Sequence, residues 1–264
     1  MGMIYLIQVS FEKSLKEFIR YKFEMISMIA GLYFLFIAMF FGAKSFGLGI
    51  EANQSSLDST LEGFVAGYFL WTIMLMIFFD TAQGVIEDAN KGTLEQISMS
   101  GLGLNKVLIV KSLTNLLINI VICFVVLFSI MATTGYWLNM KVGQLLFILL
   151  LGSFSMIGLS MIFAGLALIF KRIQSFLNIM QYLLIALVLP GSSAFTPLVS
   201  SLIPFRPSIE LFYDVALGGM NIIDFTIIQY VSVCLNSIVY FGIGLLVFDL
   251  CCKKAKRSGL LGQY

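Results

Sequence analysis

The feature that most constrains this chain is a series of long segments without a single charged residue. A helix needs about 20 apolar residues to cross the hydrocarbon core of a membrane. Six runs have roughly that length or more, and they are Met25–Ala43, Gly63–Phe79, Ser112–Met140, Val142–Phe170, Ile173–Phe205 and Phe225–Phe248. The chain is 59% hydrophobic and only 11% charged, which a water-soluble fold could not accommodate. The sequence therefore predicts an all-α integral membrane protein with six transmembrane helices.

The distribution of lysine and arginine predicts the orientation of these helices, because short cytoplasmic loops carry an excess of both. Only Lys44, Lys141 and Arg206 fall on one side of the predicted membrane. The other side holds Lys13, Lys16, Arg20, Lys22, Lys91, Lys106, Lys111, Lys171, Arg172, Lys253, Lys254, Lys256 and Arg257. We therefore expect a multi-pass protein of the plasma (cell) membrane with both termini in the cytoplasm.

The first 24 residues predict a helix that lies along the membrane surface. Apolar residues recur at helical spacing while charged residues take the opposite side. The apolar side includes Phe11, Leu15, Phe18 and Ile19. The pattern alone is explained by a simple interfacial anchor that obeys the positive-inside rule and has no further role. A single membrane domain is expected, made of this interfacial helix (1–24), a six-helix region (25–250) and a cytoplasmic tail (251–264).

The fifth run is too long for one helix. Its 33 residues would extend about 50 Å at 1.5 Å per residue, well beyond a core of about 30 Å. Pro190-Gly191 is the first strong helix breaker in it. We expect a span from Ile173 to about Leu189, then a broken or re-entrant segment at Ala194–Phe205 before the sixth helix; an irregular outer loop fits the pattern as well.

The loop between the second and third runs predicts a short helix. Thr93 followed by Gln96 fits a capping box, and Glu95 in the first turn suits the helix dipole. Gly92 precedes the helix, and Leu94 and Ile97 give it an apolar side. Such a helix could dock onto a partner or simply end a surface loop, and its pattern does not choose between them.

Polar residues inside the runs are the remaining candidates for function. Buried polar groups in lipid seek partners across helices, so interhelical bonding and the lining of a substrate path are both open. The candidates are Asn115, Asn119, Asn178, Gln181, Gln229 and Asn236. Small residues of the fourth run, including Gly152, Gly158 and Gly165, predict close helix packing.

Several chemistries leave no trace in the sequence. The chain has no histidine, no phosphate-binding Gly-x-x-x-x-Gly-Lys-Ser/Thr loop and no Gly-x-Ser-x-Gly elbow. We therefore expect no catalytic, cofactor-binding or metal-binding residues in this chain. A secondary carrier is disfavoured, because no ionisable residue sits near the centre of a span.

The order of these pieces resembles the permease subunits of type-two ABC exporters, a family that includes drug, bacteriocin and cell-wall polysaccharide exporters. The resemblance covers the layout of the chain, and its specific part is Gly92-Thr93-Leu94-Glu95-Gln96, which follows Ile86-Glu87-Asp88 at the end of the second span. In this family the block resembles the coupling helix. A proline often follows it there, whereas Ser98–Gly101 stands here.

The resemblance implies roles for both cytoplasmic segments. Glu87 and Gly92 to Ile97 would contact an ATPase subunit, and the N-terminal helix would be the family's elbow helix. The partners implied are two ATP-binding cassette ATPases, which would hold the ATP and Mg²⁺, a second permease chain, identical or related, and membrane lipid, but no nucleic acid. The cargo would be drug-like, peptide, lipid or polysaccharide.

Two other functions remain open at this point. One is an immunity or sensor subunit that binds a toxic peptide without moving it, and the other, less favoured, is a secondary carrier. In the exporter interpretation the chain is not an enzyme by itself, and the whole complex would be an ABC-type translocase.

Overall fold

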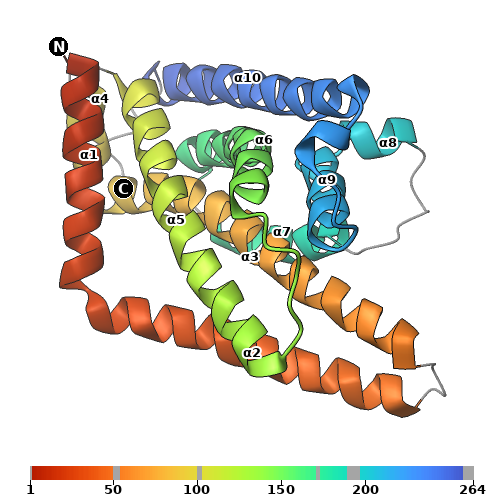
Figure 1. Ribbon diagram of the computed structural model, residues 1–264. Helices are drawn as coiled ribbons and strands as arrows, with labels where there is room; N and C mark the ends of the chain where they lie inside the picture. Colours follow the sequence, from red (N-terminus) through yellow and green to blue (C-terminus); the bar gives the residue numbers. More distant parts are fainter. Residues whose placement is uncertain (1, 50–53, 100–102, 171–172, 189–196, 258–264) are drawn as a thin grey trace.

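The computed structural model describes residues 2–49, 54–99, 103–170, 173–188 and 197–257, and within these ranges it contains helices and no strand. Figure 1 shows the helices arranged as a bundle with one helix set across its end. Their bounds are α1 Gly2–Arg20, α2 Lys22–Gly49, α3 Gln54–Asn90, α4 Thr93–Met99, α5 Leu104–Thr134, α6 Val142–Ile169, α7 Gln174–Val188, α8 Pro197–Leu202, α9 Arg206–Ala216, the 3₁₀ turn η1 Ile222–Asp224, and α10 Ile227–Arg257.

The N-terminal helix lies across the end of the bundle, and α2 then turns away from it (Figure 1). The chain bends at Tyr21, between α1 and α2. α1 packs against α5 and keeps Phe11, Leu15 and Ile19 between 43 and 54% exposed. The apolar side chains of α1 are thus available to lipid, and the interfacial position of this helix stays a prediction.

The centre of the bundle is α6, which packs most extensively against α10 and then α3. Three glycines of α6 permit close packing, Gly158 and Gly165 against α10 and Gly152 against α9. A Cβ added to Gly158 would lie 2.2 Å from the Tyr240 carbonyl oxygen, and one added to Gly152 would lie 2.3 Å from Ser208 Oγ. At Gly165 the added atom would meet Cys251 and Phe248 at 3.2 Å. The close packing predicted from small residues is thus confirmed.

Helix α9 fixes the end of α7. The Arg206 guanidinium donates from Nη1 to the Leu187 carbonyl oxygen at 2.6 Å, and the Tyr213 hydroxyl donates to the Val188 carbonyl oxygen at 3.0 Å. The last carbonyls of a helix have no partner within that helix. These two side chains therefore stabilise the described end of α7.

The structure agrees with most of the predicted spans and differs in detail. Five described helices, α2, α3, α5, α6 and α10, are long and apolar enough to cross a membrane. α7 has 15 described residues, about 22 Å of helix. The six-helix count remains a prediction, as does the re-entrant segment, because residues 189–196 lie outside the described ranges.

Three boundaries change. α3 continues past the run that ends at Phe79 as far as Asn90, and α5 ends at Thr134, before the end of the run at Met140. α10 continues through the first residues of the predicted tail to Arg257. A further helix, α9, follows the predicted broken segment.

Candidate functional site

The candidate site begins where α3 ends. The Lys91 and Gly92 amides donate to the carbonyl oxygens of Glu87 and Ala89, and Gly92 has φ +67°. Glycine adopts this left-handed conformation without a steric cost, so it ends the helix and turns the chain into α4. The Glu87 carboxylate accepts a hydrogen bond from Lys91 at 3.0 Å and raises the pKa of that ammonium above its ordinary value.

The start of α4 differs from the predicted capping box. Thr93 is the first helical residue, and its hydroxyl donates to the Asp88 carbonyl oxygen at 3.1 Å. That bond points back to α3 and ties the two helices together. Asp88 is also held from the other side, because its carboxylate pairs with Lys111 of α5 at 2.9 Å.

The exposure of the α4 side chains divides the predicted contact block. Leu94 is 1% exposed in the core, and Ile97 is half-buried against that core. Glu95 and Gln96 are exposed. The burial of Leu94 anchors α4 and sets the direction of the two exposed side chains, and its contact with a partner stays a prediction.

A line of polar pairs continues from this anchor along α3 and α5 into the spans. Thr81 donates to Ser112 at 3.1 Å. Farther along, Asn119 donates to the Asp80 carboxylate at 2.6 Å. Polar side chains inside a span seek partners in this way. The pairs connect the α3–α4 corner with the middle of the bundle.

Two further helices join the same end of the molecule. Ser14 of α1 donates to Asn115 of α5 at 3.2 Å. Asn105, near the start of α5, donates to Asp249 of α10 at 2.9 Å, and Asp249 also pairs with Lys253. Helices α1, α3, α4, α5 and α10 are thus interconnected around the exposed edge of α4 (Figure 1).

The structure does not bring the six predicted path-lining residues together. Asn115 and Asn119 bond to α1 and α3 as just described. On α7, Asn178 is exposed and Gln181 half-buried. Their role in a path stays a prediction.

The two polar residues on α10 have other partners. Gln229 accepts hydrogen bonds from Thr226, one turn before it. Asn236 donates to the carbonyl oxygens of Ser201 and Ile203 and accepts from the Phe205 amide. Sequence analysis missed this connection, since nothing in the pattern reveals which backbone lies opposite an asparagine.

Metal chemistry finds no support in the described ranges, which contain no group of three or more cysteine, aspartate or glutamate side chains able to hold an ion. The free cysteines Cys123, Cys251 and Cys252 are buried.

Comparison with known protein families identifies the chain at this point. The family model described as ABC-2 family transporter protein matches residues 42–246, which is most of the chain and includes α4. The chain belongs to the ABC-2 family. No curated protein matches it in sequence.

Membership of the ABC-2 family makes the chain a membrane component of an ABC transporter. Membrane subunits of this family associate with ABC ATPase subunits and are generally not catalytic themselves. The family resemblance predicted from sequence is thus confirmed. The roles of individual ABC-2 residues, including Glu87 and residues 92–97, stay predictions.

Proposed function

We propose that this chain is the membrane-spanning subunit of an ATP-driven exporter and that α4 docks onto the separate ATPase subunit. The observation that carries the proposal is the orientation of α4. Leu94 holds the helix to the bundle, while Glu95 and Gln96 face outward at the end where α1, α3, α5 and α10 are interconnected. A partner that pushes on this edge would act on all five helices.

The proposed mechanism follows from the hydrogen bond and the ion pair that connect α4 to α3 and α3 to α5. ATP binding would draw two ATPase subunits together, with ATP and Mg²⁺ held there, and each α4 would move with its ATPase. The Asp88–Lys111 pair and the Thr93–Asp88 bond would carry that motion into α3 and α5. Cargo can bias such an equilibrium only through different affinities for its states. A second permease chain, identical or related, would complete the path.

The proposal predicts that the charge on Glu95 matters to assembly. The tagged chain is purified from its native membrane, and the ABC ATPase that accompanies it is identified and quantified. Glu95→Lys is expected to reduce recovery of the ATPase at least tenfold, because reversing a buried interfacial charge costs about 2–5 kcal/mol. Glu24→Lys is the matched control, since Glu24 is also exposed but lies outside α4.

Leu94→Ala separates docking from folding. Burying a leucine stabilises a fold by about 1.5–3 kcal/mol, so this change is expected to lower the chain's own thermal stability, whereas Glu95→Lys leaves that stability unchanged. Equal ATPase recovery by wild type and Glu95→Lys would contradict docking through this edge. Recovery of the wild-type chain with no ABC ATPase would contradict the proposed function itself.

A further inference from the structure

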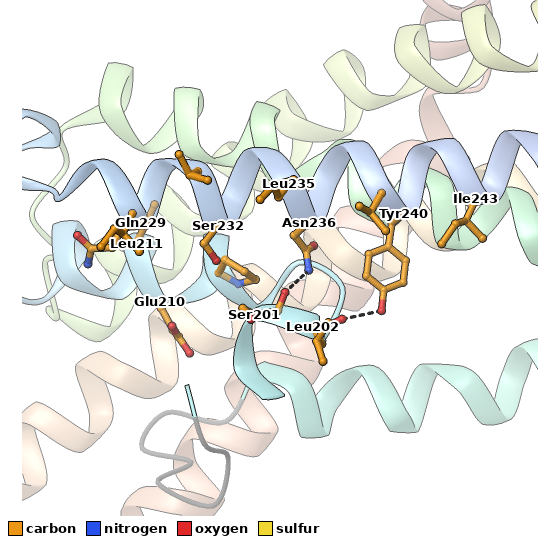
Figure 2. A pocket seen from close by; sticks show the side chains of 14 residues that line it. Ser201, Leu202, Glu210, Leu211, Gln229, Ser232, Leu235, Asn236, Tyr240 and Ile243 are labelled. Atoms are coloured by element: carbon orange, nitrogen blue, oxygen red, sulfur yellow. Dashed lines mark hydrogen bonds between the residues drawn. The ribbon is translucent and has the colours of Figure 1, made fainter. Parts of the chain in front are cut away.

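A groove of about 880 Å³ runs along α10, between this helix and the pair α8 and α9 (Figure 2). Its walls are mainly aliphatic and include Leu202, Val231, Leu235 and Val239. These side chains are 47 to 70% exposed. α10 is long and apolar enough to span a membrane, yet only 28% of its most apolar window is buried. The groove is therefore an apolar hollow on a helix whose apolar side chains are largely exposed in this chain.

Two polar side chains in the middle of the groove, Asn236 and Tyr240, are bonded to the backbone at the end of α8. Asn236 donates to the Ser201 and Ile203 carbonyl oxygens at 2.8 and 2.9 Å. The Tyr240 hydroxyl donates to the Leu202 carbonyl oxygen at 2.7 Å, and Figure 2 shows both groups directed at the α8 backbone. An occupant of this stretch thus meets hydrocarbon surface and little hydrogen-bonding capacity.

One end of the groove is different. Figure 2 shows Glu210 and Gln229 at that end, with Ile243 at the other. Glu210 pairs with Arg206 at 3.2 Å, but its side chain is 49% exposed whereas that of Arg206 is 7% exposed. The charge that an occupant can reach is therefore the carboxylate. Asp214 follows one turn later on α9; burial, and then the nearby Glu210, raise the pKa of its carboxyl.

The groove is long enough to hold a lipid tail over the full depth of one leaflet. Gln229 and Ile243 are fourteen residues apart on α10, which is about 21 Å at 1.5 Å per residue. Half of a hydrocarbon core of about 30 Å is roughly 15 Å. An acyl chain anchored at the Glu210 end would lie within the groove over the depth of its own leaflet.

We propose that this groove binds a membrane lipid with a primary ammonium headgroup, its acyl chain along α10 and its ammonium at Glu210. Phosphatidylethanolamine has this chemistry. The headgroup would donate a charge-assisted hydrogen bond to the half-exposed Glu210 carboxylate, beside the bond from Arg206. Binding of this lipid does not depend on the proposed export function, because it uses a surface far from α4.

Native mass spectrometry of the purified full chain tests the proposal. The protein is titrated in mixed micelles with phosphatidylethanolamine, phosphatidylcholine or phosphatidylglycerol, and retained lipids are counted. Retention of phosphatidylethanolamine is expected at roughly tenfold lower concentration than phosphatidylglycerol. Glu210→Gln is expected to remove this preference. Leu235→Trp, which fills the groove, is expected to lower retention of all three lipids, while Leu246→Trp, exposed on α10 outside the groove, is the matched control.

Four results would overturn the assignment. Equal retention of the three lipids by wild type would refute the ammonium contact, even if Glu210→Gln fails to fold. Unchanged retention in Leu235→Trp, or an equal loss in Leu246→Trp, would refute the groove as the site. A chain dimer that carries no lipid and dissociates in Leu235→Trp would show that a second copy occupies the groove.

Discussion

Asn236 shows how one side chain can organise a turn between helices in a membrane. Its amide satisfies two carbonyl oxygens and one amide group of the turn from α8 to α9. Phe205 in that turn is fully buried and has φ +66°, a conformation that bulky residues rarely adopt. Irregular backbone at membrane depth needs protein partners. The asparagine therefore supports a turn that the local sequence would not favour.

We predict that Asn236→Ala destabilises the protein by about 1–3 kcal/mol, because it leaves buried backbone groups of the turn without partners. The measurement is the midpoint of thermal unfolding in detergent. Gln229→Ala is the control, since this amide lies on the same helix and bonds only to Thr226 among the contacts described above. Equal midpoints for the two variants would show that Asn236 does not support the turn.

At the scale of the element, the contact between α6 and α10 depends on backbone approaching backbone. Gly158 and Gly244 face each other, and a Cβ added to Gly244 would lie 2.2 Å from the Gly158 carbonyl oxygen. The Ser237 hydroxyl donates across the same interface to the Leu151 carbonyl oxygen at 2.7 Å. Small residues are what allow helices to pack this closely in lipid.

Gly158→Ala is predicted to destabilise the protein by about 1–3 kcal/mol, because the added methyl group meets the Tyr240 backbone and cannot be accommodated by a side-chain rotation. Gly242→Ala is expected to have the opposite sign. Nothing lies within 4 Å of a Cβ there, and alanine favours a helix by about 1 kcal/mol over glycine. Denaturant or thermal unfolding measures both, and destabilisation of similar size in both would argue against the close contact.

Helices that are marked by local residues can be predicted from the sequence, whereas burial that depends on distant helices cannot. The short helix α4 was predictable because Gly92 and Thr93 mark its start locally. The burial of Leu94 was not, because it depends on where α3 and α5 lie. α9 was missed although Pro207 stands near its start and Ile209, Phe212 and Ala216 repeat at helical spacing. The uncharged run Ile173–Phe205 ends just before α9, so its length predicts a broken span and gives no sign of the helix that follows.

For the whole molecule, the charges on the two sides have different structural roles. Two of the three basic residues on the predicted outer side are engaged in the fold. Arg206 pairs with Glu210 and caps α7, and Lys141 donates to the Gly219 carbonyl oxygen and to Asn221. At the other end, Lys253 pairs with Asp249 on the surface. Arg206 and Lys141 therefore stabilise the fold through their bonds. Their presence on the predicted outer side is compatible with the excess of basic residues on the other side.

The orientation itself is the last prediction, and exposure decides which positions can test it. Ser208 lies on the predicted outer side but is 1% exposed, so a reagent could not reach it. Met220 is 48% exposed on that side, and Asn90 is exposed beside α4. After replacement of Cys123, Cys234, Cys251 and Cys252, an impermeant maleimide should label Met220→Cys in intact cells and Asn90→Cys only after lysis. A permeant maleimide should label both in intact cells, which controls for accessibility. Labelling of Asn90→Cys from outside would place α4 on the wrong side of the membrane for contact with a cytoplasmic ATPase, and the docking proposal would then fail together with the predicted topology.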